Sequence, residues 1–209
     1  MSNDSTAISL VGQIIEKAVS GNATLNISGS DELAKSYVLN NTYKNNDERV
    51  NSLINWESVK SFTAGFVTGL GGLVTLPIAL PAGLVSTWII QARLCAAIAK
   101  IYGHDIKEER VQTMVLLAIL GGSGKEVLKE AGVQIGKEIT WQTIKILTPK
   151  IVKEINKIIG YKLITRAGQK TLLSNLGKAL PIVGGVIGGS IDATSCKTVG
   201  TAAKYLFKK

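Results

Sequence analysis

Residues 61–92 read SFTAGFVTGLGGLVTLPIALPAGLVSTWIIQA and contain no Asp, Glu, Lys or Arg. At first sight, an uncharged stretch of this length is typical of a transmembrane helix. Pro77 and Pro81 argue against a single span, because proline lacks an amide hydrogen and clashes with the preceding helical turn. Residues 61–76, the first arm, would extend roughly 24 Å, which is less than a hydrocarbon core of about 30 Å. We therefore expect a helical hairpin over Phe62–Ile90 that is either buried in a core or dips part-way into a bilayer.

Small residues recur at helical spacing in this hairpin and again near the C-terminus. They are Gly65, Gly69 and Gly72 in the first segment, and Gly184, Gly188, Asp192, Cys196 and Gly200 in the second. Glycine inside a helix costs about 1 kcal/mol relative to alanine, so such a series implies a compensating gain from close approach of two helix backbones. A soluble bundle and a membrane-embedded bundle both use such packing. In either case, we expect the last helix to pack against the hairpin.

Two charged residues interrupt these apolar surfaces. Arg93 ends the uncharged run, and Asp192 lies on the glycine face of the last helix. An unpaired buried charge is very costly, whereas a paired one is tolerated. We therefore hypothesise a buried ion pair between Arg93 and Asp192.

Helical periodicity extends over the rest of the chain, and strand signals are weak. The pattern predicts helices over residues 8–19 and 31–44, a third that begins at Asp47, and further helices over 105–120 and 125–147. Another helix begins at Pro149, followed by a break at the GQK stretch of residues 168–170, a short helix to Gly177 and a last helix from Pro181. The third of these helices runs through Val50, Leu53, Ile54 and Trp56 into the apolar region. The predicted fold is an all-α, single multi-helix bundle around the glycine-rich hairpin.

Positive charge is concentrated in the C-terminal third of the chain. The net charge is +9, and residues 137–209 carry thirteen basic and three acidic side chains. Lys150, Lys153, Lys157 and Lys162 border an apolar stripe in the helix that begins at Pro149, a pattern that suits the surface of an anionic membrane. An ordinary bundle helix with a solvated lysine face has the same pattern. Nucleic acid is a poorer partner, because the basic region lacks interleaved aromatic residues.

The sequence contains no recognisable catalytic, cofactor-binding or metal-binding constellation. A glycine-rich stretch at residues 115–127 fails the phosphate-loop pattern, because Ile119 replaces the first glycine and Glu126 follows Lys125. The single histidine, His104, is expected to be a solvated residue at a helix end. Cys95 and Cys196 are expected to be reduced core residues of a cytosolic protein. We therefore expect a protein that is not an enzyme.

Three segments together resemble the EcsC family. They are GFVTGLGGLVTLPIALPAGL at residues 65–84, IIQARLCAAIAKIYGHD at 89–105 and ALPIVGGVIGGSIDATSCKTVGTAAKYLF at 179–207. The last is also similar to the glycine-rich tail of a helical domain attached to some bacterial GTPases. The resemblance spans roughly residues 50–207, so we divide the chain into an N-terminal helical extension (1–45) and an EcsC-like helical domain (46–209). It implies an all-α bacterial protein with no established enzymatic activity and no catalytic residues to transfer.

Two classes of function fit these features. The first is a non-enzymatic helical protein that associates with an anionic membrane surface or a membrane protein, with a conditional, membrane-perturbing effector as a variant. The second is a soluble cytosolic binding module that recognises an acidic protein. The expected location is the cytoplasm, either free, peripheral to the inner membrane or inserted in it. The oligomeric state is left open.

Overall fold

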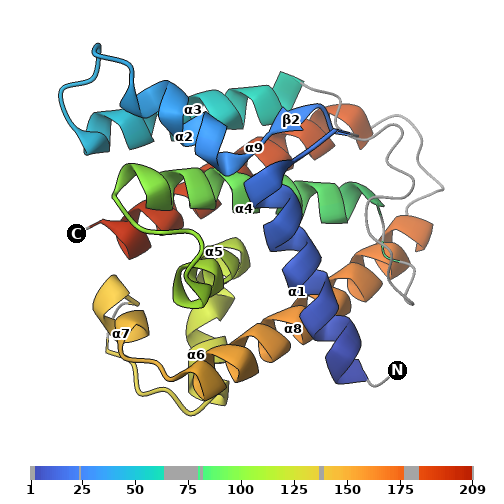
Figure 1. The fold of residues 1–209 in the computed structure, drawn as a ribbon. Coiled ribbons are helices and arrows are strands. Elements are labelled where there is room, and N and C mark those ends of the chain that lie inside the picture. The colour runs from blue at the N-terminus through green and yellow to red at the C-terminus, as the bar shows by residue number, and fades with distance from the viewer. Residues whose placement is uncertain are drawn as a thin grey trace.

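The amphipathic periodicity of the chain is realised as α-helices packed in several directions around a shared core (Figure 1). The computed structural model describes residues 3–23, 25–63, 80, 82–136, 139–176 and 184–208. The helices are α1 (Asn3–Ser20), α2 (Ser30–Val38), α3 (Asn46–Thr63), α4 (Ala82–Ile101), α5 (Glu109–Leu120), the 3-10 helix η1 (Gly121–Ser123), α6 (Gly124–Glu130), α7 (Trp141–Lys145), α8 (Pro149–Leu176) and α9 (Gly184–Phe207). Strands β1 (Gly21–Asn22) and β2 (Ile27–Ser28) form a small antiparallel pair between α1 and α2. The fold class is all-α, as the sequence predicted.

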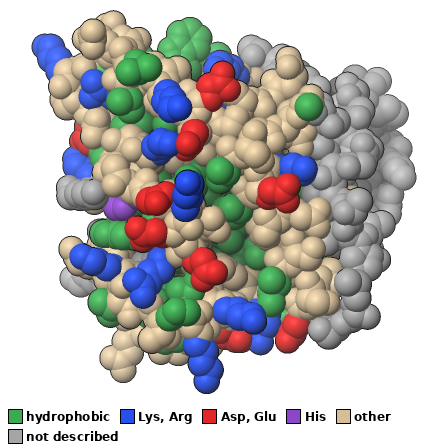
Figure 2. Space-filling view, viewed as in Figure 1, with side chains coloured by type: hydrophobic (Ala, Val, Ile, Leu, Met, Phe, Trp, Pro, Cys, Tyr) green, Lys and Arg blue, Asp and Glu red, His purple; other side chains and the backbone are tan. Residues whose placement is uncertain are grey.

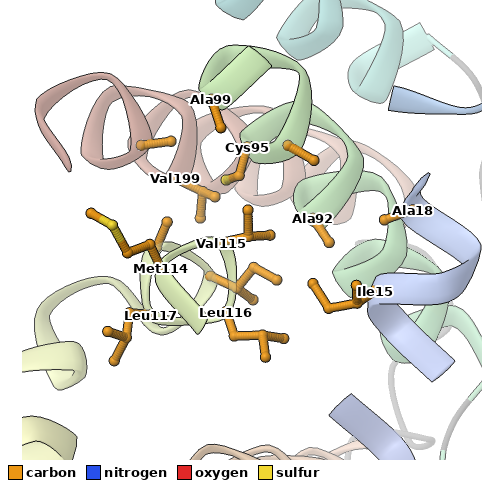
Figure 3. Packing of buried hydrophobic residues seen from close by; sticks show 14 of the residues in the cluster. Ile15, Ala18, Ala92, Cys95, Ala99, Met114, Val115, Leu116, Leu117 and Val199 are labelled. Atoms are coloured by element: carbon orange, nitrogen blue, oxygen red, sulfur yellow. The ribbon is translucent and has the colours of Figure 1, made fainter. Parts of the chain in front are cut away.

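Helix α4 lies at the centre of the fold because it is apolar on nearly every face. A helix of this kind has to be buried on all sides, and α4 contacts α1, α2, α3, α5 and α9. Its small side chains, Ala92, Cys95 and Ala99, allow these neighbours to approach. Figure 3 shows them close to side chains from α1, α5 and α9, among them Val115 and Val199. The second arm of the predicted hairpin is therefore a core helix, while residues 64–79 of the first arm lie outside the described residues.

The last helix packs against α4 and α3 in opposite directions. Gln91 of α4 donates a hydrogen bond to Ser195 Oγ of α9 at 2.9 Å, and His104, just after α4, contacts the carbonyl oxygen of Phe207 at the end of α9, so the two helices run the same way. Lys204 of α9 donates to Asn51 Oδ1 of α3 at 2.8 Å, whereas the earlier Gly200 lies against the later Ile54, so α3 runs antiparallel to α9 (Figure 1). The prediction that the last helix packs against the hairpin is thus confirmed for its second arm.

Two glycines allow helices to come closer than any other residue would. A Cβ added at Gly160 of α8 would lie 2.3 Å from the carbonyl oxygen of Ala7 in α1. A Cβ added at Gly200 of α9 would lie 2.9 Å from Ile54 Cγ1 of α3. The sequence-based series of packing glycines included Gly200 and omitted Gly160. The contact at Ala7 also places α1 in the same core as the rest of the bundle.

Several predicted helix boundaries were wrong: α1 already begins at Asn3, and α2 ends at Val38, six residues before the predicted end. The helix predicted over residues 125–147 is interrupted, because α6 ends at Glu130 and Gly132 has a positive φ of 77°. That left-handed conformation is characteristic of a residue that follows a helix end. In contrast, α8 continues through the predicted break at residues 168–170, since glycine inside a long, well-packed helix costs only about 1 kcal/mol.

Among the described residues, two segments are long and apolar enough to cross a bilayer. They are Gly83–Ile101 and Glu109–Glu130. In the most apolar part of each segment, 83% of the first and 67% of the second is buried inside the protein. Helices that form the core of a bundle meet the same criteria of length and composition. The two segments are thus compatible with membrane association without locating the protein in a membrane. The thiols of Cys95 and Cys196 are both buried in the same core.

Candidate functional site

Two basic residues, Lys60 and Arg93, are the charges that flank the uncharged run of residues 61–92. Both contact one carboxylate in the structure. Lys60 Nζ lies 3.0 Å from Glu57 Oε1, and Arg93 Nη1 lies 3.0 Å from Glu57 Oε2. Glu57 therefore ties the segment of α3 where the uncharged run begins to the segment of α4 where it ends.

The Arg93 guanidinium makes further hydrogen bonds to the small strand β2. Its Nε donates to the carbonyl oxygen of Ser28 at 2.6 Å, and its Nη2 donates to Ser28 Oγ at 3.3 Å. Arg93 and Glu57 are only 7% and 4% exposed. A buried ion pair persists when such additional hydrogen bonds satisfy its polar groups. We refer to Glu57, Lys60, Arg93 and Ser28 as the Glu57 cluster.

The position of Glu57 follows from the spacing of apolar residues in α3. Val50, Leu53 and Ile54 are buried, and a residue seven positions after the first lies on the same helix face. This spacing places Glu57 inside the protein, whereas Trp56 lies on the outer face and is 58% exposed. The sequence-based prediction followed the apolar residues to Trp56 and missed Glu57. The helical spacing alone could have identified it.

Tyr37 of α2 lies at the edge of the Glu57 cluster. Burial, followed by the nearby Glu57 carboxylate, raises the pKa of the Tyr37 phenol to about 12, and Arg93 offsets part of this increase. The Tyr37 ring stacks on Tyr43 with ring centroids 5.9 Å apart. The phenol is therefore neutral at physiological pH and adds no charge beside the buried ion pair.

The predicted partner of Arg93 was Asp192. The structure gives Arg93 the partner Glu57, which comes from α3 rather than from the last helix. The backbone at Asp192 belongs to α9, but its side chain lies outside the described residues. The need for a buried countercharge at Arg93 was recognised correctly from the sequence, and the tertiary structure supplies that charge from Glu57.

The four lysines predicted as a membrane or partner surface fall into two pairs. Lys150 and Lys153 are exposed and have no ion-pair partner among the described residues. Lys157 pairs with Glu154 at 2.9 Å, and Lys162 pairs with Glu130 at 3.2 Å. The apolar stripe beside them is buried in the core, including Val152, Ile155, Ile159 and Leu163. Figure 2 shows basic and acidic side chains interspersed over the described part of one face.

Of the predicted packing glycines other than Gly200, the structure places only Gly184 and Gly188. Gly65, Gly69 and Gly72 are outside the described residues, and Gly184 and Gly188 lie in the first turns of α9. In Figure 1, the ends of α3 and α8 and the beginnings of α4 and α9 are all on the right-hand side. We call this side, defined by Thr63, Leu176, Ala82 and Gly184, the apolar end.

The opposite side, which we call the charged end, is formed by Asp47, Tyr102, Lys204 and Lys208. The Tyr102 hydroxyl donates to Asp47 Oδ1 at 2.7 Å, and the two lysine ammonium groups lie 3.8 and 2.5 Å from Asp47 Oδ2. The hydrogen bonds from Lys208 and then Tyr102 lower the pKa of the Asp47 carboxyl. These contacts join the beginning of α3 to the ends of α4 and α9.

His104, next to the charged end, was predicted to be a solvated residue, and this prediction was wrong. The side chain is 7% exposed, its Nε2 lies 2.7 Å from the carbonyl oxygen of Phe207, and its ring packs edge-on against Trp141. The C-terminal turn of α9 folds over the ring and covers it. No three His, Cys, Asp or Glu side chains are grouped to hold a metal ion within the part of the chain that the structure describes.

These features define an all-α helical-bundle protein with a buried ion-pair cluster at the base of an uncharged chain segment. A model of the EcsC protein family matches residues 9–209, and the chain belongs to that family. The match begins inside α1, so it extends beyond the region of residues 50–207 in which the resemblance is visible by eye. Comparison with curated proteins and with solved structures gave no match.

Proposed function

We propose that this protein is a non-enzymatic helical protein that associates with a bilayer, or with a protein in it, through its apolar end. One observation carries the proposal. Residues 61–92 have no charged side chain, and residues 171–196 have only Lys178 and Asp192. The helix ends at Thr63, Ala82, Leu176 and Gly184, which belong to these two segments, lie on the same side of the molecule (Figure 1). Two chain segments with so few charges, which leave and re-enter the helices on the side opposite the charged end, suit contact with a membrane.

The proposal places the protein on the cytoplasmic side of the inner membrane. The two segments apolar enough to span a bilayer are themselves largely buried inside the bundle, so we assign neither of them as a span. Contact is instead made by the apolar end, and the rest of the bundle remains folded in water. A conditional variant, in which the protein perturbs the bilayer that it contacts, belongs to the same proposal.

The exposed lysines of α8 would contribute separately from the apolar end. Lys150 lies 26 residues before Leu176, which corresponds to roughly 39 Å along the helix. This distance exceeds the Debye length of about 8 Å at physiological salt, so the α8 lysines and the apolar end would contact a bilayer in different orientations of the protein. High salt weakens the lysine contribution and leaves that of the apolar end largely intact.

The alternative is a soluble cytosolic module that binds an acidic protein. The observation that favours it is the burial of the apolar stripe of α8, which leaves a polar outer face on which Lys150 and Lys153 are exposed. Lys150 and Lys153 would then be the contacts with the acidic partner, as exposed cations without a partner of their own among the described residues.

A flotation experiment tests the proposal. The purified full-length protein is mixed with vesicles of phosphatidylethanolamine and phosphatidylglycerol, or with neutral phosphatidylcholine vesicles, at low and high salt. We expect flotation with the anionic vesicles that persists in part at high salt. Release of an encapsulated dye in the same samples tests the membrane-perturbing variant. A protein that remains at the bottom of the gradient under every condition overturns the membrane proposal and leaves the soluble module.

A matched pair of variants measures the lysine contribution. Lys150→Glu/Lys153→Glu reverses the charge of the two exposed residues of α8, and Lys35→Glu/Lys44→Glu makes the same change at exposed positions in and after α2. We expect the first variant to lose the salt-sensitive part of flotation and the second to retain it. Equal losses in both variants would show that net charge, rather than α8, is responsible.

A further inference from the structure

The outer face of α3 carries two exposed apolar side chains just before the uncharged run begins. Trp56 is 58% and Val59 is 53% exposed, and they are three residues apart, so they share one helix face. The opposite face of the same turns is buried through Ile54 and Glu57. A large exposed tryptophan beside a second apolar residue indicates a contact surface.

The groove beside Trp56 is lined by neutral hydrogen-bonding groups and by one carboxylate, that of Glu48. It has a volume of about 530 Å³ and is formed by Tyr43, Asn51, Ser52, Asn55 and Val59 together with Trp56, with Glu48 also contributing. Aromatic rings mixed with amides and hydroxyls suit the boundary between water and lipid, where one side of a residue is apolar and the other is hydrated.

The distance along α3 from Trp56 to the start of the uncharged run is close to the thickness of the headgroup layer. Ser61, the first residue of the uncharged run, lies five residues after Trp56, which is roughly 7.5 Å along the helix. Each polar layer of a bilayer is about 5–8 Å thick. If the uncharged run begins at the hydrocarbon boundary, Trp56 lies among the headgroups, where tryptophan is enriched in membrane proteins.

We propose that Trp56 and Val59 form an interfacial anchor that occupies the headgroup layer of an anionic bilayer and sets the depth of the apolar end. This inference rests on the membrane association proposed above. It names the surface of α3 that meets the lipid and excludes the charged end from that contact.

Tryptophan quenching tests the anchor in the full-length protein. The chain contains Trp56, Trp88 and Trp141, of which Trp88 is buried. Trp141 lines a hollow shared with Lys208 at the charged end. The W141F variant retains Trp56, and the W56F variant retains Trp141, with Trp88 common to both. Vesicles of phosphatidylethanolamine and phosphatidylglycerol carry bromine atoms either close to the headgroup or near the end of the acyl chain.

We expect the emission of W141F to shift to shorter wavelength and to be quenched more strongly by the shallow bromines than by the deep ones. Emission of W56F is expected to change little with either vesicle. Flotation without quenching of Trp56 overturns the anchor and leaves the proposed membrane association standing. Absence of flotation overturns both. Quenching by the deep bromines alone overturns the assigned depth.

Substitutions provide a second, independent measurement. Trp56→Ala is expected to lower the vesicle partition coefficient by roughly tenfold, and Trp56→Tyr to restore most of it, because tyrosine also favours the interface. Ile146→Ala is the matched control, since Ile146 is 79% exposed and lies between α7 and α8. An equal loss in Trp56→Ala and Ile146→Ala overturns the anchor, as does self-association through Trp56 in the absence of lipid.

Discussion

The two ends of this helical bundle each contain one carboxylate paired with two cations, but the two carboxylates differ in burial. At the charged end, one carboxylate, Asp47, pairs with two lysines that remain in contact with water. At the base of the apolar end, the Glu57 carboxylate also contacts two cations, but it is almost completely buried. Exposed ion pairs contribute little to stability, whereas breaking a buried pair is costly because it leaves an uncompensated charge. The same residue types therefore serve solubility at one end and structure at the other.

The largest expected effect on stability comes from replacing a carboxylate with an amide, a change that can be made at either end. Glu57→Gln leaves the Arg93 guanidinium buried without its countercharge and is expected to lower the free energy of unfolding by about 3–5 kcal/mol. Asp47→Asn is expected to lower it by less than about 1 kcal/mol. Urea unfolding followed by circular dichroism measures both.

A double variant distinguishes a lost ion pair from a disturbed core. Glu57→Gln/Arg93→Met removes both charges of the pair and is expected to recover a large part of the stability lost in Glu57→Gln, because no unpaired charge remains. If Glu57→Gln and Asp47→Asn lower the free energy of unfolding equally, the proposed difference between a buried and an exposed carboxylate is wrong.

The next effect concerns the helices that connect the two ends. Gly200 of α9 faces Ile54 of α3 and Leu94 of α4 at distances too short for a methyl group. Gly200→Ala is expected to destabilise the protein by about 1–3 kcal/mol through overpacking. Gly168→Ala in α8 is the control, since a Cβ there meets nothing within 4 Å. We expect it to stabilise the protein by up to about 1 kcal/mol, so thermal melting should shift in opposite directions.

A smaller effect on stability is expected at low pH, where the Asp47 carboxylate of the charged end is protonated. The folded state lowers the pKa of Asp47, so its contribution to stability is complete above the unfolded pKa of about 3.9 and is lost as the pH falls below that value. Asp47→Asn lacks this contribution at every pH. The urea midpoints of the wild type and of the variant should therefore converge as the pH falls below about 4. A constant difference between pH 7 and pH 3 would contradict the assignment.

The smallest effect appears in alkali beside the Glu57 cluster. The pKa of Tyr37 is raised to about 12 in the folded protein, from about 10 in an unfolded chain. A raised pKa contributes stability that is complete below pH 10 and is lost as the pH rises through about 12. Tyr37→Phe should reduce the steepness of this loss. The pKa of Tyr102 at the charged end is also raised, so Tyr102 still contributes to the loss of stability in alkali in the Tyr37→Phe variant. Urea midpoints and tyrosinate absorbance measure both.

Much of the fold could be predicted because apolar spacing is local information. The inner faces of α1 and α8 and the apolar character of α4 follow directly from their periodicity. The break after α6 could not be located from spacing, because a glycine is compatible with both a helix interior and a helix end. Only the φ of Gly132 distinguishes these possibilities. The burial of His104 was also missed, since it depends on Phe207 near the other end of the chain.

The sequence by itself determined that the chain is helical, that residues 61–92 are uncharged, and that Arg93 needs a buried countercharge. Only the tertiary structure decided that this countercharge is Glu57 and that two of the four α8 lysines are already paired. It also decided that α3 and α8 end, and α4 and α9 begin, on the same side of the molecule (Figure 1). The physical reason is that burial preferences are set by neighbours in the chain, whereas a charge selects its partner through space. The direction in which α3, α4 and α9 pack determines which partners are within reach.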